Sequence, residues 1–213
     1  MSAIFVRSVA FPSFWATLQW LGKKRGLLAL VALGIFAVGI ETFAVVTGWP
    51  YGEFSYGHAI GGKMFGLVPW TVPFAWTPIM LASYALASRW TNGAARLISA
   101  GVLSMIFDLV LDPGAVAQKF WTYDGGGFFY GVPLSNFLGW ILSGTIGAAI
   151  LHAFVRNNSG HSSLVTRHSV APPQMLSGAF LIITFWTAVC AWHTLWIPVI
   201  IGIALLILLS KLI

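Results

Sequence analysis

The acidic residues of this chain are few, and they stand in unusual places. All five, Glu41, Glu53, Asp108, Asp112 and Asp124, lie in or beside stretches that are apolar enough to span a membrane. A carboxylate at the centre of a bilayer costs about 3 kcal/mol even on lenient insertion scales, so an acid in such a place usually has a function. The sequence therefore directs attention to acid–base chemistry within a membrane.

Asp108 and Asp112 are four residues apart, so they would share one face of a helix. We expect Pro113 to end that helix directly after the second carboxyl group. Because repulsion and desolvation oppose two neighbouring negative charges, one acid should keep its proton beside an ionised partner, the pairing that general acid–base catalysis needs. The alternative is that Asp108 forms an ion pair and Asp112 only caps the helix. Lys63 and Lys119 are the only cations expected on that side, which favours catalysis.

Other polar residues extend the candidate site. Glu41 lies near the end of the first predicted span and is as well suited to a structural hydrogen bond as to catalysis. Glu53 and His58 lie in the aromatic loop that follows, although solvation explains Glu53 better and a structural role is the simpler explanation for a single histidine. Asn136 begins a later span at a depth from which it can hydrogen-bond the aspartate pair.

The remaining residues exclude several classes of enzyme. The five histidines lack the His-x-x-x-His or Glu-x-x-His spacing that a membrane di-iron oxygenase needs. There is no cysteine cluster for zinc or iron–sulfur ligation, and no Gly-x-Gly-x-x-Gly follows a strand. The glycine run at 125–127 lacks the Lys-Ser/Thr of a phosphate-binding loop. We therefore expect neither a metal nor a cofactor, and acid–base chemistry by protein carboxyl groups remains.

The composition is that of an integral membrane protein. The chain is 58% hydrophobic and only 8% charged, with a mean hydropathy of +0.87, whereas about a quarter of the residues of a soluble domain are charged. The net charge of +6 is spread over the loops, which indicates membrane orientation and not nucleic-acid binding.

A helix needs about 20 apolar residues to cross a bilayer. Six stretches approach that length, at 27–47, 68–87, 94–111, 134–155, 175–191 and 195–213. We predict an all-α, polytopic transmembrane helix bundle of about six spans, with residues 23–213 as a single transmembrane domain. Residues 1–22 are expected to lie along the cytoplasmic surface, because their apolar content is too broken to span.

The basic residues set the predicted orientation. With the cluster Lys23, Lys24 and Arg25 inside, nine basic residues lie in the cytoplasm and two outside, and both termini are cytoplasmic. All the acids then lie toward the outer face. In the span 134–155, the small residues Gly139, Ser143 and Gly147 recur every four positions and form a ridge for close helix packing.

An ordered set of short motifs lies between residues 35 and 150. The motifs are Trp49-Pro50-Tyr51-Gly52-Glu53-Phe54-Ser55-Tyr56, Gly66-Leu67-Val68-Pro69-Trp70 with Pro73 and Trp76, Asp108-Leu109-Val110-Leu111-Asp112-Pro113, Tyr130-Gly131-Val132-Pro133, Asn136-Phe137 and Gly139-Trp140. This set resembles the membrane carotenoid-biosynthesis proteins, a family that includes acyclic carotenoid 1,2-hydratases of the bisanhydrobacterioruberin and gamma-carotene type and whose members are longer. No such resemblance is found in residues 1–30 or 160–213.

The resemblance implies the addition of water to the terminal double bond of a linear carotenoid, giving a tertiary alcohol. A protonated aspartate, assigned to Asp108, would protonate the alkene, and Asp112 as carboxylate would deprotonate the attacking water. Glu41 is the third predicted catalytic residue, and aromatic faces would stabilise the cation. The predicted substrate-binding residues are Glu53, His58, Tyr56, Trp76, Trp121, Tyr130, Asn136 and Trp140.

Three other functions fit the same residues. The chain could be a non-catalytic pigment-binding subunit of a membrane complex, a small transporter with a proton or cation path, or a carotenoid cyclase, since protonation of a polyene can also end in ring closure. The expected partners are a lipophilic carotenoid, the lipid bilayer, and other carotenoid enzymes or a pigment–protein complex, with no nucleic acid. The expected location is a bacterial cell membrane or an internal photosynthetic membrane.

Overall fold

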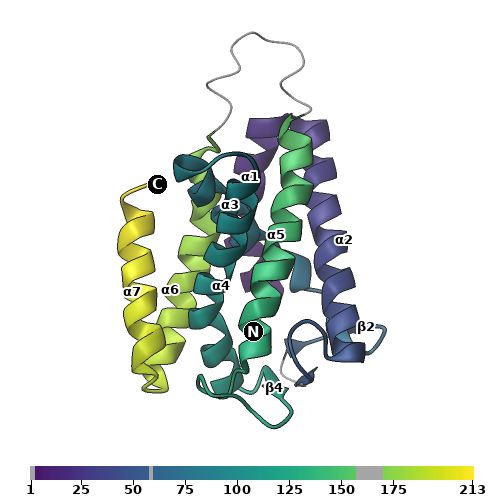
Figure 1. Ribbon diagram of the computed structural model, residues 1–213, viewed down its shortest axis with the longest axis vertical. Coiled ribbons are helices and arrows are strands. Elements are labelled where there is room, and N and C mark those ends of the chain that lie inside the picture. The colour runs from purple at the N-terminus through teal and green to yellow at the C-terminus, as the bar shows by residue number, and fades with distance from the viewer. Residues whose placement is uncertain (1–2, 58–59, 157–169) are drawn as a thin grey trace.

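The computed structural model describes residues 3–57, 60–156 and 170–213, and these form an up-and-down bundle of helices (Figure 1). A short 3-10 helix, η3 (Pro173–Leu176), leads into α6. The seven α-helices of the described residues are α1 (Ala3–Leu21), α2 (Lys23–Thr47), α3 (Val72–Trp90), α4 (Gly93–Ala117), α5 (Leu134–Arg156), α6 (Ser177–Trp192) and α7 (Trp196–Ser210).

Several of these helices are suited to a membrane. Among the described residues, four segments are long and apolar enough to cross one, and Trp196–Ser210 is a shorter apolar helix. The predicted helical membrane fold is confirmed at that level, while the number of about six spans stays a prediction. The four long segments are Lys23–Thr47, Gly93–Ala117, Leu134–Arg156 and Pro173–Trp192.

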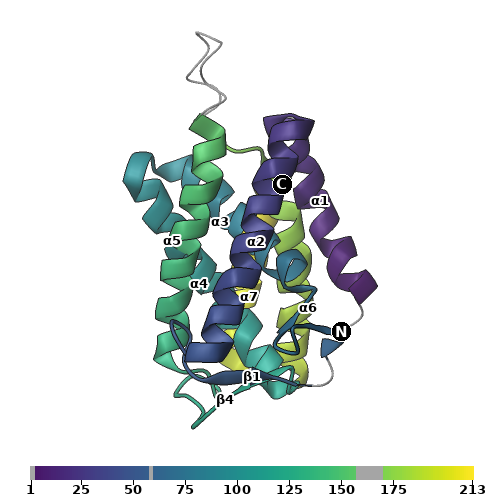
Figure 2. The same cartoon turned by 90° about the vertical axis from the view of Figure 1, so that its right-hand side faces the viewer.

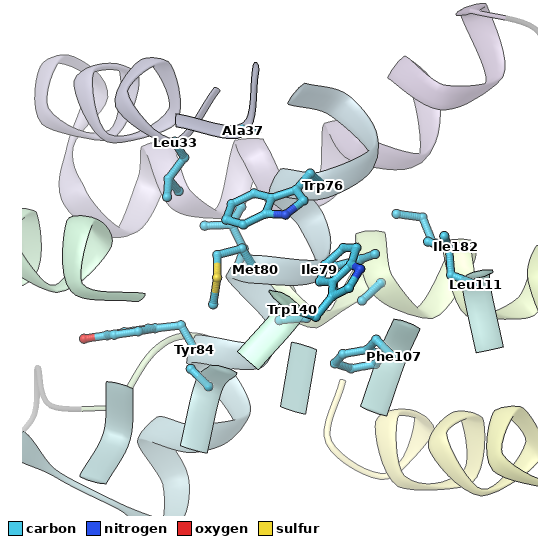
Figure 3. Close-up of a cluster of buried hydrophobic side chains, with 14 of the residues drawn as sticks. Leu33, Ala37, Trp76, Ile79, Met80, Tyr84, Phe107, Leu111, Trp140 and Ile182 are labelled. Carbon is cyan, nitrogen blue, oxygen red and sulfur yellow. The ribbon is translucent and has the colours of Figure 1, made fainter. Parts of the chain in front are cut away.

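Helix α3 forms the centre of the bundle. It packs against α1, α2, α4, α5 and α6, and every residue from Trp76 to Ser88 is buried. A helix that is apolar on all sides belongs in an interior. Figure 3 shows its Trp76, Ile79 and Met80 side chains among those of neighbouring helices, with the Trp140 ring of α5 alongside. The central helix thereby carries Trp76 into the middle of the molecule.

The N-terminal segment differs from the expectation of a broken apolar stretch. Residues Ala3–Leu21 form one continuous helix through Pro12, and this helix packs along α2, α3 and α6 (Figure 2). Ser13 is fully buried on it, donating to the Met175 carbonyl at 2.9 Å and accepting from the Gly178 N–H at 2.8 Å. Helix α1 is therefore part of the packed bundle, and its position at the cytoplasmic membrane surface stays a prediction.

The prediction that Pro113 ends its helix is wrong, because α4 continues through it to Ala117. Proline removes one helical N–H, but neighbouring groups in a bundle can satisfy the carbonyls that are freed. The Cys190 thiol of α6 donates to the Val110 carbonyl at 3.3 Å, within this turn. Gly114 follows the proline, and a Cβ there would lie 2.8 Å from the Trp186 ring. Close packing against α6 thus supports the helix where the proline weakens it.

The two long loops at one end of the bundle are joined by a small sheet. Strand β1 (Phe54–Tyr56) pairs antiparallel with β4 (Trp121–Tyr123), so that Phe54 lies opposite Tyr123 and Tyr56 opposite Trp121. A second pair, β2 (Lys63–Met64) with β3 (Val68–Pro69), precedes α3. Residues two apart on a strand point to the same face, and so do directly opposed partners, so the paired loops present all four aromatic residues on one face, which lines the cavity described below.

Candidate active site

A cavity of about 110 Å³ lies among the helices α1 to α6 and the paired loops. A buried water needs about 10–15 Å³, so the cavity has room for several waters or for the end of a longer molecule. Most of its wall is apolar, and the carboxyl groups on it are those of Glu41 and Asp112, with the Asn136 amide beside them. A small polar cluster in an apolar cavity is the usual form of a site for a lipophilic ligand.

Asn136 joins the two aspartates of α4. Its Nδ2 donates to Asp108 Oδ2 and to Asp112 Oδ2, at 2.7 Å in each case. The spacing of four residues therefore places the two carboxyl groups together, and Asn136 reaches them from α5 as the sequence predicts. All three side chains are buried. Within the described ranges neither aspartate has a recorded ion pair with a lysine or arginine, so the expected alternative of a salt-bridged Asp108 finds no support there.

The two aspartates differ in how many donors they receive. Asp112 Oδ2 also accepts from the Tyr123 hydroxyl at 2.6 Å, and a further side-chain hydrogen bond comes from Trp121. Among the described residues, Asp108 accepts a hydrogen bond only from Asn136, and its Oδ1 is buried without a partner. Hydrogen bonds from several donors stabilise the charged form of a carboxyl group. The Asp112 carboxyl group is therefore better suited than that of Asp108 to carry a negative charge.

Glu41 is the second carboxyl group of the cavity. It is buried on α2, and its Oε2 accepts from the Tyr56 hydroxyl at 2.8 Å. Burial, and next the nearby Glu41, raise the pKa of Tyr56 well above its ordinary value. Burial, followed by Asp112, likewise raises the pKa of Tyr123. Both hydroxyls thus stay protonated near neutral pH and act as permanent donors to the cavity carboxyl groups.

Aromatic rings surround this polar cluster. Trp76 and Trp140 stack with their centroids 6.3 Å apart and an interplanar angle of 22°. The Tyr51 ring lies against Trp140 at 6.4 Å, and Phe54 lies against Tyr123 at 5.7 Å. Ring faces carry negative charge density and attract cations within about 6 Å. The cavity can therefore support a cation that forms inside it.

The structure brings most of the predicted residues together. Of the catalytic candidates, Glu41 and Asp112 line the cavity and Asp108 stands beside them. Glu53 and Tyr130 are not brought to the site: Glu53 is exposed, and Tyr130 packs on Phe129 away from the cavity. His58 lies outside the described residues. The predicted binding residues that do line the cavity are Tyr56, Trp76, Trp121, Asn136 and Trp140.

Sequence reasoning missed two parts of the site. Tyr123, the donor to Asp112, was not singled out, although it lies two residues after Trp121 and so shares one face of a strand with it. The far wall was missed too, because α1 and α6 lie in segments that carried no signal of function. Within the described ranges, no three ligating side chains converge as in a metal site. The cavity residues from α1 and α6 are Phe5, Val6, Val9, Ile182, Phe185 and Trp186.

Comparison with known proteins shows a similarity that covers nearly the whole chain and not only the short motifs. A family model described as carotenoid biosynthesis protein matches residues 1–209. Bisanhydrobacterioruberin hydratase of Haloarcula japonica is 39% identical over 180 residues, which is 82% of this chain and 59% of the relative. The chain thus spans about three fifths of the length of that curated protein. No solved structure matches.

Proposed function

The chain belongs to the carotenoid biosynthesis protein family, and from that premise we propose that it adds water to the terminal double bond of a linear carotenoid. The proposal is supported by the cavity, whose wall contains the Glu41 and Asp112 carboxyl groups together with aromatic rings. Hydration of an alkene needs a proton donor, a proton acceptor and stabilisation of a cation. The side chains of the cavity supply all three.

We assign the roles of the carboxyl groups from the number of hydrogen-bond donors that each one has. Asp112, with the Tyr123, Asn136 and Trp121 donors, acts as the carboxylate that takes a proton from water. Asp108 does not line the cavity, so it is poorly placed as the acid that the sequence suggested. Glu41 lines the cavity, and in the described part of the chain its carboxyl group accepts a side-chain hydrogen bond only from Tyr56, so it acts as the proton donor.

The hydration then takes place in three steps: protonation of the alkene, addition of water, and return of the proton. The Glu41 carboxyl proton passes to the less substituted carbon of the terminal double bond, and the π electrons form the new C–H bond. The resulting tertiary cation is stabilised by ring faces such as that of Trp140. Water forms the C–O bond, Asp112 takes the proton that this water loses, and the product is a tertiary alcohol. Return of a proton from Asp112 to Glu41 restores the starting state.

The cavity also supplies a path for the rest of the polyene. From the carboxyl groups it extends to Val9 of α1 and to Ile182 and Phe185 of α6. A linear carotenoid is far longer than a cavity of about 110 Å³ can hold, so the remainder would lie between these helices and in the surrounding bilayer. Lipid would thus deliver the substrate directly, and other carotenoid enzymes in the same membrane would produce it.

The topology is part of the same proposal. Lys23, Lys24 and Arg25 follow α1, and Arg156 ends α5, so these basic residues lie at the end of the bundle opposite the acids (Figure 1). We place that end and the C-terminus in the cytoplasm, with about six spans, in a bacterial cell membrane or an internal photosynthetic membrane. The start of α1 lies toward the opposite end, because Phe5 and Val6 line the cavity beside the acids (Figure 2), so the N-terminus is not part of this placement.

Isotope labelling tests the reaction. The protein is produced in a host that accumulates lycopene, and the pigments are analysed by mass spectrometry after growth in water enriched in oxygen-18. Hydration places the label of water in a new tertiary hydroxyl group, while a host with the empty vector gives no such product. Label from molecular oxygen, or a cyclised product without oxygen, would contradict the proposal, and the second result would identify a cyclase.

A further inference from the structure

Among the described residues, four buried polar side-chain atoms at or beside the cavity have no hydrogen-bond partner. One is the Trp76 indole nitrogen. The other three are oxygens on residues close to one another, namely the Tyr51 hydroxyl, the Ser143 hydroxyl and Asp108 Oδ1. The exposed fractions of these residues are 2%, 0% and 0%. Buried polar atoms are nearly always paired with protein or with ordered water, so three in one place indicate that something polar binds between them.

Packing explains why these residues meet. Asn136, Gly139 and Ser143 share one face of α5. A Cβ at Gly139 would lie 2.5 Å from Tyr51 Cδ1 and 2.9 Å from the Pro50 carbonyl oxygen, so only glycine lets the Tyr51 ring cross this face. The ring then carries its hydroxyl toward Ser143, and Asp108 approaches from α4 through its bond to Asn136.

The three groups complement one another chemically. The Tyr51 and Ser143 hydroxyls lie near each other, but among the described residues neither forms a hydrogen bond of acceptable geometry. Burial, and next the nearby Glu41, raise the pKa of Tyr51 well above its ordinary value, so it remains a neutral donor. Two hydroxyls that can donate or accept, with one carboxyl oxygen that accepts, match the roughly three hydrogen bonds that a buried water makes.

We infer that Tyr51, Ser143 and Asp108 form a water-binding site that supplies the water consumed in the reaction. This inference rests on the proposed function. A linear polyene that fills the cavity displaces water from its apolar walls, whereas Asp108 and Ser143 stand outside the cavity lining and the polyene does not reach them. Tyr51 belongs to both the water site and the cavity wall, so it connects the stored water to the cation.

The test separates capture by water from protonation. Purified protein in lipid nanodiscs is given lycopene in D2O. Mass spectrometry then measures the amount of hydrated product and the amount of deuterium in the recovered substrate. Deuterium in the substrate reports cations that formed and then lost a proton instead of adding water. Ser143→Ala and Tyr51→Phe each remove one of the hydroxyl groups that would hydrogen-bond the water. Ser83→Ala is the matched control, because Ser83 is as buried as Ser143 and equally without a partner among the described residues, but it lies on α3, about two helical turns beyond Trp76.

We expect the ratio of hydrated product to deuterium exchange to fall about fivefold to tenfold in both site variants, the scale of one lost hydrogen bond, and to stay unchanged in Ser83→Ala. Folding of each variant is checked by gel filtration, and either variant that folds suffices for the test. An unchanged ratio in the folded variants, with hydration intact in the wild type, overturns the water site alone. Absence of hydrated product from the wild type overturns the proposed function and the water site together.

Discussion

The sharpest test of the catalytic assignment compares Asp112→Asn with Asp108→Asn. Both changes replace a carboxyl group by an amide of the same shape on the same face of α4. Asp112→Asn removes the proposed proton acceptor, and we expect turnover to fall by about 10² or more, the usual contribution of general base catalysis. Asp108→Asn keeps a neutral group beside Asp112, and we expect a loss of no more than about tenfold, the scale of one altered hydrogen bond.

Loss of fold does not explain the expected difference. The amide oxygen at position 112 can still accept from Tyr123 and Asn136, whose donors lie 2.6 and 2.7 Å from Asp112 Oδ2. Each of these bonds weakens by about 1 kcal/mol when its acceptor becomes neutral. A neutral side chain is also cheaper to bury, which offsets this loss. The net effect is small beside the roughly 5–15 kcal/mol that keeps a domain folded.

The assay measures initial rates of tertiary alcohol formation in nanodiscs, at matched amounts of protein that elutes as a single species. A larger loss in Asp108→Asn than in Asp112→Asn would reverse the assignment. Near wild-type rates in both variants would remove the aspartates from the mechanism.

Three further predictions concern the cavity and the topology. Tyr123→Phe removes a donor to Asp112 and should lower turnover about tenfold, whereas Tyr130→Phe, away from the cavity, should leave the rate unchanged; equal rates in the two variants would contradict the role of Tyr123. Val9→Trp fills the cavity between α1 and α6 and should raise KM with less effect on kcat, while Val46→Trp on the exposed face of α2 should not; a wild-type KM for Val9→Trp would exclude this path for the polyene. A green fluorescent protein fused to the C-terminus should fluoresce and an alkaline phosphatase fusion should be inactive, and the opposite pattern would place that terminus outside.

The sequence predicted the local parts of the site well. The spacing of Asp108 and Asp112 decides that they share a helical face, whatever surrounds that helix. Asn136 follows from its depth in a neighbouring span. The helices were found because apolar length dominates the energetics of a membrane segment. These features depend on a few neighbouring residues or on composition, and both can be read from the chain.

The remaining features depend on contacts between distant segments. Helix α4 passes through Pro113 because α6 packs on that turn, and nothing near the proline in the chain reveals this. Helix α1 joins the cavity wall through Val9 although its own apolar pattern is weak. Glu53 carries the right chemistry, but pairing of the loops leaves it exposed. The spacing of two residues between Trp121 and Tyr123 was a local sign that both side chains share the face of a strand that lines the cavity.

The pairing of β1 with β4 has a consequence for how the cavity behaves when the helices move. Tyr56, the donor to Glu41, is on β1, and Tyr123, the donor to Asp112, is on β4. The two carboxyl groups belong to different helices, α2 and α4, but each is tethered to the same two-stranded ladder. Movement of α2 relative to α4 is therefore resisted by the backbone hydrogen bonds between the loops, and the separation of the Glu41 and Asp112 carboxyl groups depends on this small sheet as well as on the helices that carry them.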